Sequence, residues 1–206
     1  MKDKFLYAFS ELRKEKKRDF NQTAELIINL SNFNPKKESV NIFVTLPHKA
    51  RDIKTCAFLD KQSSFFDLVI QKDQFEIWKD KNKLKNLVKD YNFFVATAPL
   101  MPTIATNFGR VLGPAGKMPS PQLGILTGSD DNVLKDISEK MKKMVRIKTK
   151  EASIKVPIGK EDMPDSELTE NAFAVYNAVI AALPKKTENI KNVLLKFTMS
   201  KTVKVK

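Results

Sequence analysis

The stretch from Gly109 to Pro121, which reads GRVLGPAGKMPSP, constrains the fold more than any other part of this chain. Three glycines and three prolines occur within its thirteen residues. Proline fixes φ and has no amide proton, while glycine allows the positive φ that tight turns need. This density predicts an ordered loop with an extended backbone, because an ordinary helix or strand would not tolerate it.

A glycine-rich loop with a lysine invites comparison with phosphate-binding loops. The Walker pattern needs glycine at the position of Val111 and serine or threonine at the position of Met118. It should also open a helix, whereas Pro119 and Pro121 follow here. A nucleotide- or phosphate-binding enzyme that uses the Gly109–Pro121 loop therefore stays open only as the alternative function.

The composition indicates a globular, strongly basic protein. The chain has 206 residues, 42% of them hydrophobic, which is enough for one large or two small domains with real cores. Lys and Arg number 37 against 24 Asp and Glu, giving a net charge of +13. Such an excess indicates either a polyanionic partner or a role of the charge in solubility. Seven lysines between Lys185 and Lys206 alternate with apolar residues, as expected either of a nucleic-acid-binding strand or of a solvated edge strand.

Several function classes find little support in the residues. No apolar stretch is long enough to span a bilayer and no signal peptide is recognisable, so we expect a cytoplasmic protein with no membrane partner. Cys56 and His48 are the only residues of their kinds, which excludes an internal disulfide and a zinc site. The usual catalytic motifs are absent. We therefore predict no catalytic residue, metal or cofactor, and interpret the acidic pair Glu161-Asp162 as a helix start.

The hydrophobic pattern divides the chain into three parts. Residues 4–17 show helical spacing, residues 20–30 and 40–46 alternate as strands do, and Phe20 falls on the same face as Leu26. Short apolar runs then alternate with helical segments, which predicts a parallel α/β sheet. The expected strands are 55–59, 68–70 and 93–97, and the expected helices are 80–89, 100–107 and 132–144. After Met144 the pattern predicts basic strands, a helix between Pro164 and Pro184, and a final strand over 193–205.

These parts predict a mixed α/β and α+β fold with two domains. Residues 1–49 and 145–206 form a discontinuous α+β domain, and residues 50–144 form an inserted Rossmann-like, three-layer α/β domain. Two chain crossings would join them and make a natural hinge. The hinge residues that we expect are His48, Lys49, Met144 and Val145.

The same loop and four other segments resemble the large-subunit ribosomal protein L-one family, in its archaeal-like type. GRVLGPAGKMPSP is similar to the family's glycine-proline segment, although Ala115 replaces a basic residue. Phe197-Thr198-Met199 resembles the start of its terminal threonine-methionine-glycine signature, but Ser200 replaces the glycine and Lys201 the following proline. The remaining resemblances lie at residues 20–30, 46–48 and 156–160, so together they span nearly the whole chain.

This resemblance implies the same discontinuous two-domain plan and a function in RNA binding. The protein would be a structural constituent of the large ribosomal subunit, bind ribosomal RNA, and form the mobile stalk near the exit site for deacylated tRNA. Repression of its own mRNA is a further role that the family implies, and the free protein would be a monomer. The expected RNA-binding residues are Phe20, Thr23, Glu25, Lys148, Lys150, Thr198, Met199 and Ser200.

Overall fold

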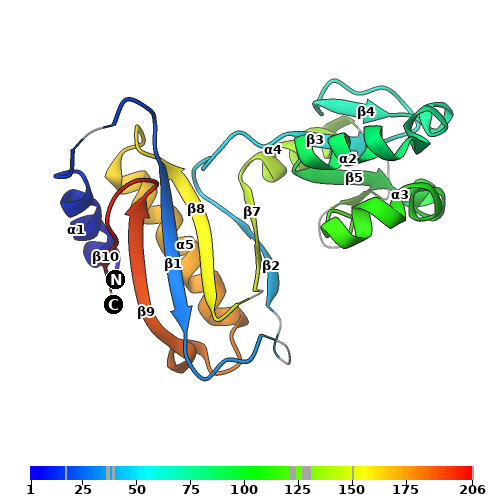
Figure 1. The fold of residues 1–206 in the computed structure, drawn as a ribbon. Helices are drawn as coiled ribbons and strands as arrows, with labels where there is room; N and C mark the ends of the chain where they lie inside the picture. Colours follow the sequence, from blue (N-terminus) through cyan, green and yellow to red (C-terminus); the bar gives the residue numbers. More distant parts are fainter. Residues whose placement is uncertain are drawn as a thin grey trace. The chain divides into compact units, whose positions relative to one another are not determined.

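A computed structural model describes residues 1–16, 18–35, 38, 40–120, 124–126, 131–149 and 151–205. The chain divides into two compact units (Figure 1). Unit 1 contains Met1–Arg51 and Lys143–Lys206, and unit 2 contains Asp52–Lys142. The expected domain boundaries, after residue 49 and before residue 145, each lie two residues from these bounds.

Unit 1 is built around a four-stranded antiparallel sheet in the order β10-β9-β1-β8. Its strands are β1 (Thr23–Leu30), β8 (Ser153–Lys160), β9 (Ile190–Phe197) and β10 (Val203–Lys204). Buried and half-buried residues alternate along β1, because successive side chains of a strand point to opposite faces. Leu26 and Ile28 are fully buried on the face that the helices cover.

Two helices and a two-stranded ribbon complete the core of unit 1 (Figure 1). The helices are α1 (Lys2–Leu12) and α5 (Asp165–Ala182), and the ribbon pairs β2 (Asn41–Thr45) with β7 (Met144–Lys148). Phe5 and Phe9 of α1 are fully buried, and the ring of Phe5 meets Tyr176 of α5 edge-on. A short helix, η4 (Lys186–Asn189), precedes β9.

Unit 2 is a three-layer α/β unit with a parallel sheet in the order β4-β3-β5-β6. One core contains Phe58, Phe94 and Phe108, and the other contains Ala57, Val95 and Leu134, so successive residues of the central strands feed opposite layers. Its strands are β3 (Thr55–Phe58), β4 (Leu68–Ile70), β5 (Phe93–Thr97) and β6 (Ile125–Leu126). Its helices are η1 (Lys72–Gln74), η2 (Ile77–Lys79), α2 (Lys81–Asp90), η3 (Ala98–Leu100), α3 (Met101–Ala115) and α4 (Asp131–Lys142).

The prediction of a loop from Gly109 is wrong for the first half of that stretch. Helix α3 continues through Gly109 and Gly113 to Ala115. Pro114 lies in its last turn, where it removes one hydrogen bond shortly before the helix ends. Gly116 follows with a φ of 66°, the left-handed conformation that commonly ends helices. The stretch is therefore a helix end followed by a short connection, and Pro121 lies outside the described residues.

The single final strand that the pattern predicts is also wrong. β9 ends at Phe197, residues 198–200 form a turn, and the chain resumes as β10 at Val203. The amide of Ser200 donates to the carbonyl oxygen of Phe197, which closes the turn. At the same end of the sheet, β1 begins at Thr23 and not at Phe20. Phe20 is consequently 51% exposed instead of sharing the buried face.

A candidate RNA-binding surface at one end of the sheet

The first residues of β1 and the last residues of β8 and β9 lie together at one end of the sheet in unit 1. Thr23 pairs with Lys160 of β8, and Ala24 pairs with Phe197 of β9. The antiparallel register therefore brings the start of β1 beside the turn that follows β9. We call this region the end surface and define it as Phe20, Thr23, Thr198, Met199 and Ser200.

Hydrogen bonds hold the turn of the end surface against β1. The hydroxyl of Thr198 accepts from the amide of Thr23 at 3.0 Å and lies 3.4 Å from the carbonyl oxygen of the same residue. The hydroxyl of Ser200 accepts from the amide of Phe197 at 2.8 Å and donates to the carbonyl of Lys201 at 2.9 Å. The hydroxyls of Thr198 and Ser200, which we expect to contact RNA, thus also fix the shape of the turn.

Gln22 is a positioning residue that the sequence analysis missed. It is 4% exposed, and its side-chain oxygen accepts from the amide of Met199 at 2.9 Å. Its side-chain nitrogen donates to Oε2 of Glu161 at 3.1 Å, and its carbonyl oxygen accepts from the amide of Glu161 at 2.8 Å. A polar residue at a position whose alternation predicts burial was the available signal.

The end surface carries two large apolar side chains that the core does not use. Phe20 is 51% exposed and Met199 is 59% exposed. Phe20 lines a surface hollow of about 490 Å³, together with residues of the connection before β1 and of the turn after β8. A much smaller recess beside Met199 shares Glu15, Arg18 and Glu161 with this hollow, so the two lie next to each other on the surface.

Not all the expected RNA-binding residues meet at the end surface. Glu25 lies one pleat further along β1, between Pro157 and Lys196, on the face opposite to the helices. Lys148 is the last residue of β7, close in sequence to Ser153, which pairs with Asn29 near the other end of β1. Lys148 is exposed, but the register places it away from Thr23. Lys150 lies outside the described residues.

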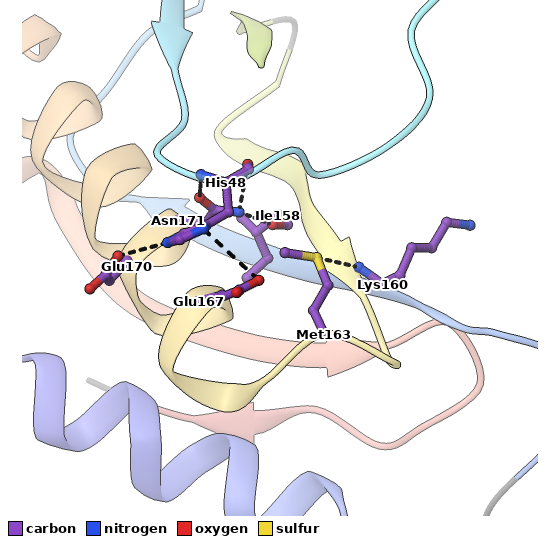
Figure 2. Close-up of polar contacts among 7 residues, drawn as sticks. All are labelled: His48, Ile158, Lys160, Met163, Glu167, Glu170 and Asn171. Carbon is purple, nitrogen blue, oxygen red and sulfur yellow. Dashed lines mark hydrogen bonds and ion pairs between the residues drawn. The ribbon is translucent and has the colours of Figure 1, made fainter. Parts of the chain in front are cut away.

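The residues expected to form a hinge belong to ordered parts of unit 1. Met144 and Val145 pair with Thr45 and Val44 in the ribbon. Figure 2 shows His48 beside α5, where the side chain of Asn171 accepts from its amide at 2.9 Å and donates to its carbonyl oxygen at 3.0 Å. The ring Nε2 of His48 lies 2.8 Å from a carboxylate oxygen of Glu170.

Asn171 itself is fully buried and also donates to the carbonyl of Ile158 in β8, so it connects the chain after β2 to the sheet (Figure 2). Lys49 is exposed, whereas Ala50 belongs to the core of unit 1. Packing in unit 1 therefore extends beyond His48 and Lys49, up to the crossing at Arg51.

The Gly109–Pro121 stretch has a structural explanation in unit 2. Lys117 directs its ammonium group to the carbonyl oxygens of Val88 and Tyr91, at the C-terminal end of α2, where a cation is favoured. The glycines at 109 and 113 lie toward the C-terminal end of α3, which carries partial negative charge and disfavours phosphate. This arrangement does not form a phosphate cradle.

Potential reactive groups are few in the part of the chain that the structure describes. Burial raises the pKa of the Cys56 thiol far above its usual range, which suits a small core residue and not a nucleophile. Among the described residues there is no group of three or more His, Cys, Asp or Glu side chains that could hold a metal ion. No helix in this part of the chain has the length and hydrophobicity needed to cross a membrane.

Comparison with known proteins gives a consistent result over nearly the full length. The sequence profile of the Ribosomal protein L1p/L10e family matches residues 12–201. The chain is similar to proteins named large ribosomal subunit protein uL1. That of Nanoarchaeum equitans is 36% identical, with 94% of this chain and 95% of the relative covered. Those of Thermococcus kodakarensis and Methanocaldococcus jannaschii are 36% and 35% identical, covering 99% and 100% of this chain and 97% and 96% of the relatives.

A profile match over most of the chain, together with relatives above 30% identity along nearly their whole length, shows the family. The sequence resemblance is thereby confirmed. The chain belongs to the Ribosomal protein L1p/L10e family, whose members are structural components of the ribosome and not enzymes.

Proposed function

We propose that this chain binds large-subunit ribosomal RNA through the end surface of unit 1. The observation that carries the proposal is the presence of two large exposed apolar side chains, Phe20 shortly before β1 and Met199 within the hydrogen-bonded turn after β9. Apolar side chains exposed in a cluster usually mark a binding site. A turn that is already ordered loses little conformational freedom when a partner binds.

The chemistry of the end surface suits RNA better than another protein. Folded RNA is recognised through its shape, its 2′-hydroxyls and unstacked bases that lie on aromatic side chains. Phe20 supplies such an aromatic ring, and Thr23 supplies polar backbone and side-chain groups beside it. Cations lie close in the sheet, because Lys160 pairs with Thr23 and Lys196 pairs with Glu25. The net charge of +13 adds long-range attraction to a polyanion.

Substitution of Met199 tests the assignment without disturbing the core. Met199→Ala removes an exposed side chain, so stability should stay the same, while affinity for the ribosomal RNA should fall by about tenfold through lost apolar contact. Leu6→Ala is the matched control, since Leu6 is 48% exposed in the same unit but lies on α1. Filter binding at fixed salt measures both. Equal affinities of the two variants and the parent would refute the site.

The salt dependence of binding tests the electrostatic part of the proposal. We expect about four to six phosphate contacts, so affinity should fall steeply between 50 and 200 mM salt, although less than the roughly 10³- to 10⁵-fold typical of six to ten contacts. Discrimination against duplex DNA of equal length should survive the added salt. Equal affinity for duplex DNA would mean that charge alone drives binding.

Two finer roles rest on the family resemblance alone. As part of the large subunit, the chain would contribute to the mobile stalk beside the exit site for deacylated tRNA, and it would repress translation of its own mRNA by binding a similar RNA structure. If both RNAs use the end surface, Met199→Ala should weaken both interactions to the same extent. A competition assay between ribosomal RNA and the mRNA leader measures this.

The alternative of a nucleotide-binding enzyme loses its basis. Half of the stretch that would bind phosphate is the C-terminal end of α3, and Lys117 is engaged by the carbonyls of Val88 and Tyr91. The relatives, which match this chain over nearly its whole length, are named as ribosomal proteins.

A further inference from the structure

The hollow beside Phe20 differs in charge from the rest of this basic protein. Among its described lining residues are two cations, Arg13 and Arg18, and four carboxylates, Glu15, Asp19, Glu161 and Asp162, so the charges of the described lining residues sum to −2. One of the cations is already engaged, since Arg13 donates to Asp165 and to the carbonyl of Met163. A phosphate would be repelled here, whereas a group that offers N–H donors would be attracted.

We propose that this hollow, which we call the acidic hollow, receives one unpaired guanine of the bound RNA. The guanine would stack on Phe20 and donate its N1–H and N2–H protons to the carboxylates of Glu161 and Asp162. This inference rests on the proposed function, because it requires RNA at the end surface. It adds the identity of a base and the residues that select it.

The shape of the hollow fits an extruded base. Its volume of about 490 Å³ lies within the range of roughly 300–1,000 Å³ of pockets that bind small organic groups. Phe20 contributes a half-exposed ring to the lining, and unstacked RNA bases commonly stack on such rings. The recess beside Met199 lies next to the hollow, so a nucleotide in the hollow would extend from the same RNA that covers the end surface.

The carboxylate of Glu161 is held in place before any ligand arrives. Its Oε2 accepts from the side-chain nitrogen of Gln22 at 3.1 Å and faces the amide of Gln22 at 3.4 Å. Among the contacts of the described residues, none engages its Oε1 or the exposed side chain of Asp162, so acceptors remain for a ligand. An anchored carboxylate makes a stronger and more selective hydrogen bond than a mobile one.

Guanine matches this acceptor set better than the other bases. A carboxylate only accepts hydrogen bonds, and guanine alone offers two adjacent N–H donors on its Watson–Crick edge. Adenine and cytosine offer one amino group beside an acceptor nitrogen, and uracil offers one N–H between two carbonyls. A metal ion is the other ligand that carboxylates suggest, but no group of metal-binding side chains of the required size exists among the described residues.

Neutral variants of the two carboxylates give a test whose sign separates base recognition from simple electrostatics. Removing a negative charge from an RNA-binding surface should strengthen binding if only long-range charge matters. If the carboxylates accept from guanine, Asp162→Asn and Glu161→Gln should instead weaken binding to the ribosomal RNA by about tenfold, or about 1.4 kcal/mol. Glu151→Gln is the control, because it removes the same charge from an exposed position before β8, outside the hollow.

Kethoxal, which reacts with unpaired guanine at N1 and N2, identifies the base. We expect one guanine to be protected by the full-length protein and to regain reactivity with Asp162→Asn or Phe20→Ala. Replacement of that guanine by inosine, which lacks the N2 amino group, should weaken parent binding by a similar factor. Asp162→Asn guards against a folding defect of Glu161→Gln, since the exposed Asp162 makes none of the contacts that hold Gln22.

Unchanged or tighter binding by both carboxylate variants, with no guanine deprotected, would overturn the acidic hollow as a base site while leaving the end surface intact. If the parent protein does not bind the ribosomal RNA, or if Met199→Ala leaves its affinity unchanged, the proposed function and this inference are both overturned. Tighter binding by Glu151→Gln together with weaker binding by the two carboxylate variants would support the inference, because it would show that charge removal elsewhere has the opposite sign.

Discussion

A single residue at the end of the sheet, Gln22, is buried and also holds distant parts of the chain in place by hydrogen bonds. It illustrates why local sequence patterns indicate the burial but not the hydrogen-bond partners. Gln22 lies on the same face as Leu26 in the alternation of residues 20–30, and it is 4% exposed. Its partners, Glu161 and Met199, are more than 130 residues away in sequence, at separations of 139 and 177. Pairing at such distances depends on the register of three strands, which local patterns do not contain.

Replacing Gln22 by leucine should therefore destabilise unit 1 although the position is buried. The substitution leaves the Met199 amide and one Glu161 oxygen without their partner, which costs about 1–3 kcal/mol. Urea unfolding measures the loss, and affinity for ribosomal RNA should fall as the turn loosens. Asn21→Ala, at the exposed neighbour, should change stability by less than about 0.5 kcal/mol. A Gln22→Leu variant as stable as the parent would show that the bonds of Gln22 contribute nothing net.

Whole elements were predicted well where local chemistry decides them. The three strands predicted in unit 2 are confirmed almost residue for residue, for instance Thr55–Phe58 against the expected 55–59, because their apolar runs have polar borders, whereas the two-residue β6 was not predicted. The turn after Phe197 was missed because Ser200 and Lys201 occupy positions where glycine or proline would have signalled it. Val203 and Val205 alternate with Thr202 and Lys204, so the pattern resembles one unbroken strand.

Glycines were the least reliable guide to element ends. Gly109 was read as a turn residue, yet it lies inside α3, and an added methyl group there would contact nothing within 4 Å. Gly159 lies in β8, and an added methyl group would lie 2.4 Å from the Leu168 side chain and 2.8 Å from the Met163 sulfur. The close approach of β8 to α5 explains why a glycine occupies position 159. Packing does not explain the glycine at position 109.

The two glycines should consequently respond to alanine in opposite directions. Gly109→Ala should stabilise unit 2 by about 0.5–1 kcal/mol, because alanine restricts the unfolded chain and favours the helix. Gly159→Ala should destabilise unit 1 by about 1–3 kcal/mol, because Leu168 and Met163 must move. Thermal unfolding followed by circular dichroism measures both shifts. Destabilisation by Gly109→Ala would favour the loop that the sequence suggested.

At the scale of the molecule, the main question is whether unit 1 is complete without unit 2. The core of unit 1 includes Phe5, Leu26, Val175 and Leu195, and it draws only on Met1–Arg51 and Lys143–Lys206. The end surface and the acidic hollow also lie within these two segments. RNA recognition as proposed above would thus need none of the residues between Asp52 and Lys142. This organisation was predictable because the pattern changes from alternating strands to strand-helix repeats and then back again along the chain.

Excision of unit 2 tests that independence directly. The amide of Leu46 donates to the carbonyl oxygen of Lys143 at 2.8 Å, and Thr45 pairs with Met144, so the two cut ends start from neighbouring strands of the ribbon. A short glycine linker from Arg51 to Lys143 should close the gap without strain, because compact units with neighbouring ends tolerate such joins.

The joined protein should unfold cooperatively and bind ribosomal RNA within about tenfold of the parent, a difference of no more than about 1.4 kcal/mol. Circular dichroism with urea and filter binding at matched salt measure the two properties. The same protein carrying Met199→Ala serves as the control, since it should lose a further factor of about ten if the end surface is the site. A folded product with no RNA affinity would place essential contacts in unit 2, and an unfolded product would mean that unit 1 depends on unit 2 for its stability.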